Sequence, residues 1–276
     1  MERRQSPIPM PHAYTNACHR VGNLVTKAYA GPQALQRQTV EEAALRALAG
    51  RLPVAAVVDS QPGVLTTAYV EGTPGQELMT TDVAATLLHT LGRLLSELQA
   101  VRPDFTPSYD GTGVLVHHDF GPNNAVLSPD GVDVRLLADW EWCTVGDHLT
   151  DLGWCEFIVR LHHTDRAEAL TALWDGYGDR PAWPLRQAAM AERASLHGRW
   201  VRDWKGEAGF NARRAGGSPP RERAGAPQLT VDRSIARRQH QPDPAEALAL
   251  ALDLGDRHLT DLPGRRDVGA CVCLGI

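Results

Sequence analysis

Two short apolar segments that each run directly into polar residues place the tightest constraint on the fold of this chain. Residues 114–127 read VLVHHDFGPNNAVL, and residues 134–142 read VRLLADWEW. Their apolar parts are typical of buried strands, and the residues SPDG at 128–131 are typical of a turn between strands. A carboxylate or amide beside a buried strand needs a hydrogen-bond partner or a chemical role. The polar residues at these strand ends therefore predict a functional site.

A β-hairpin through this turn brings Asn124 and Asp139 to neighbouring strand ends. Both side chains offer oxygen, and oxygen ligands without thiolates suit Mg²⁺ better than zinc. One carboxylate and one amide form a sparse shell, which leaves room for phosphate oxygens and water. Asp119 lies in the loop before the hairpin, where it is placed to accept a proton. The residues alone thus predict a magnesium site beside a potential general base.

Composition limits the class of protein. A chain of 276 residues holds one large domain or two lobes. The net charge is −5, and the acidic excess falls within residues 1–206. An acidic body argues against nucleic-acid binding, and it suits either a cationic small molecule or simple solubility.

No run approaches the ~20 apolar residues of a membrane span, so we expect a cytoplasmic protein with no membrane partner, as a monomer or weak dimer. Five scattered cysteines argue against a disulfide framework.

The expected secondary structure changes character along the chain. The first third predicts a strand within 19–30, a helix over 38–50 capped by Thr39, and two strands within 52–60 and 63–72. A long helix is expected over 80–100, and the region from Asp147 to about residue 206 reads as mainly helical. Residues 207–276 are rich in Arg, Pro and Gly. We expect this tail to be poorly ordered, with one possible helix at 245–255.

The combined pattern resembles the aminoglycoside phosphotransferase family of protein-kinase-like antibiotic phosphotransferases. HHDFGPNN matches that family's His-x-Asp-x-x-x-x-Asn, ADWEW matches its strand ending in Asp-Trp-Glu, and GDHLTDLGW matches its Gly-Asp and Asp-Leu. The resemblance covers roughly residues 14–205. It implies an α+β, two-lobed protein-kinase-like fold, with a small β-rich N-lobe and a mainly helical C-lobe. The implied division is a nucleotide-binding lobe at 1–72, a catalytic and acceptor lobe at 73–206, and the tail at 207–276.

The resemblance also implies roles for the residues of the motif. Asp119 would be the catalytic base for the acceptor hydroxyl, and Asn124 and Asp139 would hold Mg²⁺ on the nucleotide phosphates. Three further residues would support the site. His117 and Asp151 would brace the catalytic loop, and Glu141 would make a weaker metal or water contact.

In the N-lobe, the resemblance implies a binding site for ATP or GTP. Lys27 would pair with the α- and β-phosphates, and Glu41, with Glu42 as the alternative, would restrain it. The backbone near Tyr69 and Val70 would hydrogen-bond the nucleotide base.

The loop over the phosphates departs from the family pattern. That family has glycines there, whereas this chain has AYTNACHRVGN, with Gly22 only after the expected turn. Thr15 and Asn16 fall near the position of the phosphates, and backbone amides there can cradle phosphate.

The implied reaction is transfer of the γ-phosphoryl group of ATP or GTP to a hydroxyl of a small molecule. The acidic body favours a cationic antibiotic, either an aminoglycoside or a basic cyclic peptide, and hence antibiotic resistance. Two alternatives stay open: a nucleotide-binding pseudoenzyme, because the phosphate loop is glycine-poor, and a metallohydrolase. The metallohydrolase would use His117, His118, Asp119 and His148. Candidate contacts for a cationic acceptor are Glu156, Asp165, Glu168, Asp175 and Asp179.

Overall fold

The computed structural model describes residues 7–10 and 16–214. Most of the predicted Arg/Pro/Gly-rich tail, including the possible helix at 245–255, lies outside these residues. The first residues of that tail, 207–214, continue the last helix, α6 (Trp183–Arg214). Thr15, which was expected near the phosphates, also lies outside the described residues.

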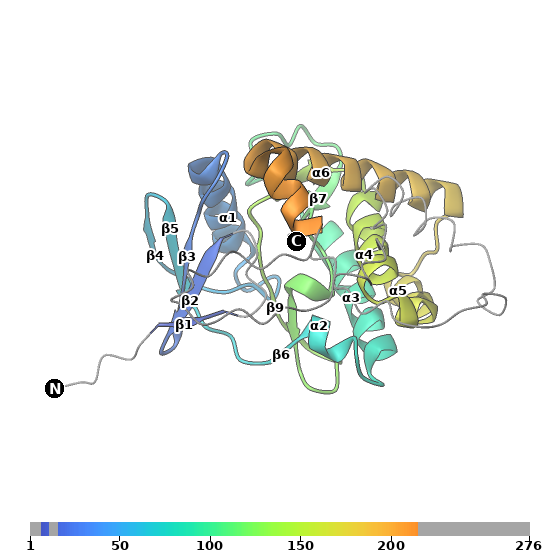
Figure 1. Cartoon of the computed structure of the whole chain (residues 1–276). Helices are drawn as coiled ribbons and strands as arrows, with labels where there is room; N and C mark the ends of the chain where they lie inside the picture. The colour runs from blue at the N-terminus through green and yellow to red at the C-terminus, as the bar shows by residue number, and fades with distance from the viewer. Residues whose placement is uncertain (1–6, 11–15, 215–276) are drawn as a thin grey trace, which may run out of the picture.

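The N-lobe is an antiparallel sheet covered by one helix (Figure 1). The strands run in the order β1-β2-β3-β5-β4. Helix α1 (Ala34–Leu48) packs on this sheet with Leu45 and Leu48 buried. The strand bounds are β1 (Ile8–Pro9), β2 (Ala17–Val21), β3 (Leu24–Ala28), β4 (Val57–Gln61) and β5 (Val64–Ala68).

Helix α1 begins earlier than its sequence predicts. The predicted start at residue 38, with Thr39 as the cap, is wrong, because the helix begins at Ala34 after Gln33 in a left-handed conformation. The Thr39 hydroxyl instead donates to the carbonyl of Leu35 at 2.9 Å, a bond that threonine makes inside helices. The predicted end is confirmed, since the helix stops at Leu48 and Gly50 adopts the positive φ that glycine tolerates.

The C-lobe is built around helix α3 (Ala84–Gln99), whose leucines at helical spacing are buried. Helix α5 (Leu170–Tyr177) lies against α3 with almost no space between the backbones. A methyl group on Gly92 would lie 2.1 Å from the carbonyl oxygen of Leu173, and one on Gly176 would lie 2.0 Å from that of His89. Glycine at both positions therefore allows this close approach.

Short strands flank the expected catalytic loop, residues 117–124, between the lobes. The predicted hairpin is confirmed, with Ala125 opposite Leu137 and Val126 opposite Leu136. Its strands belong to a sheet in the order β6-β8-β9, and β7 pairs separately with β10. The bounds are β6 (Thr73–Pro74), β7 (Val114–Val116), β8 (Ala125–Leu127), β9 (Val134–Leu137) and β10 (Thr144–Gly146). The remaining elements are α2 (Gly75–Leu78), α4 (Leu149–His162) and the 3-10 turns η1 (Pro122–Asn124) and η2 (Thr164–Ala169).

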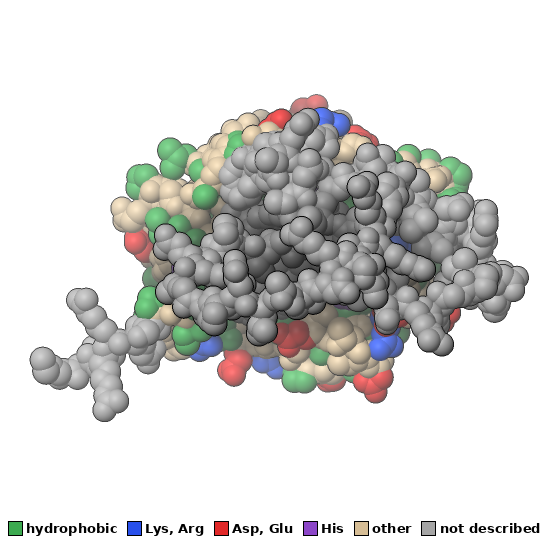
Figure 2. Space-filling view, in the orientation of Figure 1, with side chains coloured by type: hydrophobic (Ala, Val, Ile, Leu, Met, Phe, Trp, Pro, Cys, Tyr) green, Lys and Arg blue, Asp and Glu red, His purple; other side chains and the backbone are tan. Residues whose placement is uncertain are grey.

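The predicted α+β, two-lobed fold is confirmed, and α6 crosses the top of the molecule from the C-lobe toward the N-lobe in Figure 1. No helix in the described part of the chain combines the length and apolar character that a membrane span needs. Acidic and basic side chains are interspersed along the described lower rim of the molecule in Figure 2.

Candidate active site

Asp119 lies in the loop between β7 and β8, almost fully buried and held by hydrogen bonds to its side chain and main chain. The Asn124 side-chain amide donates to Oδ2 of Asp119 at 2.7 Å and to its main-chain carbonyl at 2.8 Å. The Trp154 indole donates to Oδ1 at 2.8 Å. Burial raises the pKa of Asp119 and the charge of Asp139 raises it further, while Arg193 and the hydrogen-bond donors oppose the rise. A carboxylate in this setting is a stronger base than one in water.

His117 connects the catalytic loop to the segment that carries Asp139. Its Nε2 lies 2.9 Å from the carbonyl oxygen of Ala138, and its Nδ1 accepts from the main-chain N–H of Asp119 at 3.2 Å. This pair of bonds fits the neutral ring with its proton on Nε2. Burial lowers the pKa of His117 to about 4, so the ring stays neutral near neutral pH. His117 thus holds the two acidic residues in a fixed relation.

Asp151, in the first turn of α4, holds the other side of the loop. Its carboxylate accepts from the main-chain N–H of His117 at 2.7 Å and from that of His118 at 2.8 Å. Between these contacts and Asp119, His118 adopts a positive φ of 67°, which is uncommon for a residue other than glycine. Burial raises the pKa of Asp151 to about 7. Both residues expected to brace the loop therefore contact its backbone directly.

Lys27, on β3, points into a group of three carboxylates. Its Nζ donates to Glu41 on α1 at 2.6 Å, also bonds Asp139, and lies 3.4 Å from Glu141. Burial by itself lowers the pKa of Lys27, but the carboxylates raise it well above its ordinary value. Glu42 faces away and bonds Arg46, so Glu41 is the glutamate that restrains the lysine.

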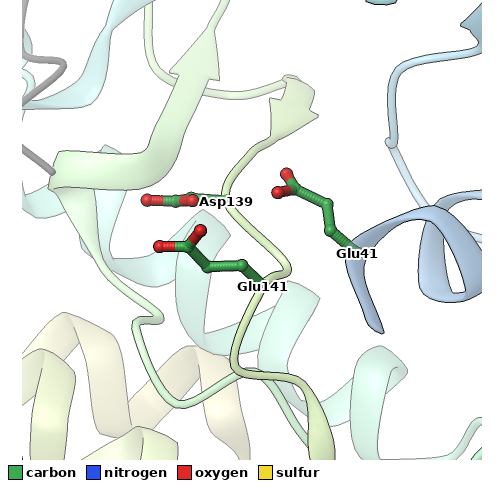
Figure 3. Close-up of side chains that lie close together, drawn as sticks. All are labelled: Glu41, Asp139 and Glu141. Carbon is green, nitrogen blue, oxygen red and sulfur yellow. The ribbon is translucent and has the colours of Figure 1, made fainter. Parts of the chain in front are cut away.

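The three carboxylates could hold a cation. Figure 3 shows Glu41, Asp139 and Glu141 converging, and one oxygen from each lies within 4.8 Å of the others. The two predicted metal ligands each bond another site residue here: Asp139 bonds Lys27, and Asn124 bonds Asp119. Both nevertheless line the same cavity.

Glu141 has a different environment from the expected metal or water contact. Its side chain is 0% exposed, and Oε2 accepts from Arg37 at 2.7 Å and from the amide of Asn16 at 2.9 Å. Its Oε1 has no hydrogen-bond partner among the described residues. Burial and the charge of Asp139 raise the pKa of Glu141 to about 7. In this structure Glu141 forms an ion pair that ties the C-lobe to α1, and its expected metal or water contact stays a prediction.

A cavity of about 220 Å³ lies between the lobes and joins these groups. Its charged end contains Lys27 and Asp139, and its body is lined by apolar side chains such as Val25 and Leu136. Tyr69 and Val70 form part of its edge. The Tyr69 amide N–H already donates to the carbonyl of Asn23 at 2.8 Å, so it is committed to the protein.

One of the expected acceptor contacts is wrong. Glu156 is fully buried and bonds Arg186 at 2.5 Å and Arg160 at 2.9 Å, so it is not accessible to a cationic ligand. The other four candidates are exposed side chains on or near η2 and α5: Asp165, Glu168, Asp175 and Asp179.

His117, His118, Asp119 and His148, which the metallohydrolase alternative requires, do not converge as a metal site. Within residues 7–10 and 16–214, the carboxylate cluster is the one group of three or more metal-ligating side chains that converges. His117 is buried against Trp140, with ring centroids 4.5 Å apart, whereas His148 is an exposed residue that directly precedes α4.

Sequence reasoning missed three residues that contact the site: Arg37, Trp154 and Arg193. Asn16 was expected near the phosphates, and its amide bonds Glu141. Two of the three missed residues carry a spacing signal. Arg37 precedes Glu41 by one helical turn, and Trp154 follows Asp151 by three residues, so each shares a helix face with a predicted site residue. Arg193 lies far from the motif in sequence and has no such signal.

No family model and no curated protein matches the sequence. Solved structures do match. The GDP and kanamycin complex of APH(2")-IIia has a TM-score of 0.57 at 14% identity, covering 78% of this chain and 89% of that chain. The gentamicin complex of APH(2")-IIa scores 0.55 at 13% identity, covering 77% and 88%. Aminoglycoside phosphotransferase APH(3'')-Id from Streptomyces rimosus scores 0.53 at 16% identity, covering 72% and 92%. The predicted resemblance to aminoglycoside phosphotransferases is thus confirmed at the level of the fold.

Proposed function

We propose that this protein is a Mg²⁺-dependent phosphotransferase that moves the γ-phosphoryl group of ATP or GTP to a hydroxyl of a small molecule. The observation that carries the proposal is the meeting of Lys27, Asn124 and Asp139 in one cavity between the lobes, with Asp119 bonded to Asn124. A cation for phosphate, oxygen ligands for magnesium and a buried base are the parts that phosphoryl transfer needs. The shared fold with aminoglycoside phosphotransferases supports the same conclusion.

The lining of the cavity favours one orientation of the proposed nucleotide. The apolar body of the cavity suits the base, whose polar edge would bond the carbonyl of Tyr69 and the backbone of Val70. The phosphates would then reach Lys27, which would exchange its bond with Asp139 for a bond to phosphate while keeping Glu41. The Asn124 and Asp139 oxygens suit Mg²⁺, which supplies charge neutralisation on the phosphates.

Asp119 would act on the acceptor hydroxyl. One carboxylate oxygen would accept a hydrogen bond from the hydroxyl and then its proton as the phosphoryl group transfers. The Trp154 and Asn124 donors keep the carboxylate in a fixed orientation during this step. The neutral ring of His117 holds the loop without adding a competing charge.

The proposed acceptor class follows from net charge and fold. We propose a cationic antibiotic, because the chain has a net charge of −5 and shares its fold with proteins solved bound to kanamycin and gentamicin. The exposed Asp165 and Glu168 on η2 are candidate contacts for its amines. We expect the enzyme to work in the cytoplasm as a monomer or weak dimer.

The proposal is tested by measuring consumption of ATP and GTP with a panel of aminoglycosides, basic cyclic peptides and uncharged hydroxylated compounds. Mass spectrometry of the acceptor should show the gain of one phosphoryl group. Asp119→Asn should abolish the gain, whereas Asp59→Asn, at an exposed aspartate on β4, should preserve it. Nucleotide binding without transfer to any acceptor would favour the pseudoenzyme, and zinc-dependent hydrolysis without nucleotide would favour the metallohydrolase.

A further inference from the structure

A buried arginine on α6 reaches back to the catalytic loop. Arg193 is only 7% exposed. Its Nε donates to the carbonyl oxygen of His118 at 2.6 Å, across a separation of 75 residues in sequence. Its guanidinium lies over the ring of Trp154, 4.8 Å from the ring centroid. Arg193 therefore contacts both the backbone next to Asp119 and the side chain that hydrogen-bonds it.

The contacts of Arg193 differ from those of a buried arginine that only stabilises the fold. Arg186 lies two helical turns earlier on the same helix and is equally buried, but it pairs with the carboxylate of Glu156 at 2.5 Å. Burial lowers the pKa of Arg193, and the carboxylates of Asp119 and Asp151 oppose that shift. Its hydrogen bond goes to a loop carbonyl and not to a carboxylate, so Arg193 contacts the backbone of the loop that carries Asp119.

Trp154 completes the connection to the carboxylate. The ring is fixed between the guanidinium of Arg193 and the stacked ring of Phe157, whose centroid lies 5.2 Å away. In this orientation its N–H donates to Oδ1 of Asp119 at 2.8 Å. Helices α4 and α6 thus reach Asp119 through one indole.

The backbone of His118 is held at both its N–H and its carbonyl group. Asp151 accepts the N–H of His118, and Arg193 donates to its carbonyl, across a residue with a left-handed backbone. That carbonyl belongs to the peptide that leads into Asp119, so its orientation sets the direction of the Asp119 side chain.

We infer that Arg193 and Trp154 are positioning residues that aim the Asp119 carboxylate at the acceptor hydroxyl. The inference rests on the proposed phosphotransferase function. Neither residue lines the nucleotide cavity, so both act on the transfer step and leave nucleotide binding unchanged. The last described helix, α6, would then contribute to catalysis through Arg193.

Steady-state kinetics of the full chain test the inference. Trp154→Phe keeps the ring and removes the donor, and Arg193→Met keeps the length and removes the guanidinium. Each should lower kcat about ten- to a hundredfold, the usual effect of one lost hydrogen bond to a charged group, with unchanged KM for nucleotide. Arg193→Lys should recover part of the loss. The matched control is Arg186→Met, which should reduce stability and leave kcat near that of the wild type.

A second readout needs no activity. In a ¹⁵N-labelled protein, the indole N–H resonance of Trp154 is assigned by its absence from the spectrum of Trp154→Phe. Its chemical shift should change when Asp119→Ala removes the hydrogen-bond acceptor. It should also move in Arg193→Met and stay in place in Arg186→Met. Wild-type protein that transfers no phosphate to any acceptor would refute the proposed function, and the resonance would still test the positioning. Wild-type kcat in Trp154→Phe, or an indole resonance insensitive to Asp119→Ala, would overturn the inference.

Discussion

The ion pair between Arg37 and Glu141 offers the sharpest test of how the two lobes are joined. Arg37 is 2% exposed and lies 2.7 Å from a carboxylate whose side chain is 0% exposed. Arg37→Met removes the cation and keeps an unbranched side chain. Breaking a buried pair by removing one partner costs about 3–5 kcal/mol. Asn16 at 2.9 Å and Lys27 at 3.4 Å remain beside Glu141, so we expect a loss near 3 kcal/mol.

The loss should depend on pH in a defined direction. The pKa of Glu141 is already raised to about 7, because burial and Asp139 disfavour its charge, and removing Arg37 raises the pKa further. The folded state then binds a proton that the unfolded state has released, so stability falls as pH rises through the raised pKa. The difference between Arg37→Met and the wild type should therefore be smaller below pH 7. Above pH 7 it should grow by up to about 1.4 kcal/mol per pH unit.

Urea unfolding followed by tryptophan fluorescence measures these differences. The double variant Arg37→Met with Glu141→Gln should recover part of the loss, because the carboxylate of Glu141 no longer lacks its cation. The hydrogen bonds from Arg37 to the carbonyls of Ala30 and Pro32 stay lost. Arg46→Met is the control, since Arg46 pairs with Glu42 at the surface and its side chain is 58% exposed; it should cost less than about 1 kcal/mol. The reasoning would be refuted if the losses of unfolding free energy in Arg37→Met and Glu141→Gln simply added in the double variant. It would also be refuted if the loss in Arg37→Met did not depend on pH.

Four further outcomes are expected. Asp119→Asn should lower kcat about 10²–10⁴-fold in a coupled assay, with the nucleotide Kd unchanged by direct titration. Lys27→Met should lower kcat/KM for nucleotide by about 10²–10³-fold, because it removes the cation that meets the phosphates. Between pH 6.5 and 4, urea unfolding should show a loss of up to about 3 kcal/mol from His117, which gains a proton only when unfolded; His117→Gln should flatten this slope. Gly92→Ala should lower the thermal midpoint, because its methyl group would clash with Leu173.

The sequence predicted those parts of the site that patterns within short segments determine. Strand patterning and the turn at 128–131 placed the hairpin, and strand ends placed Asn124 and Asp139 around one cavity. The family resemblance favoured Glu41 over Glu42, and the structure has Glu41 bonded to Lys27. The contacts of the hairpin lie between strands joined by a short turn, and Lys27 and Glu41 lie on consecutive elements of the chain.

The parts that sequence did not predict depend on packing between distant elements. Arg193 meets the catalytic loop only because α6 lies against α4. Glu156 looked like a surface charge, yet α6 covers it with Arg186. Thr39 is a good cap residue by type, but the helix continues through it because good helix formers precede it from Ala34. The helix, strand or cap preferences of single residues do not indicate which helices and strands pack against each other.

Lys27 already has carboxylate partners in this structure, so the proposed binding of a magnesium nucleotide would be an exchange of ion pairs. Lys27 would exchange Asp139 for phosphate, and Asp139 would exchange Lys27 for the metal ion. The net affinity would then be a small difference between two large electrostatic energies. A changed charge beside Lys27 would therefore shift nucleotide affinity severalfold.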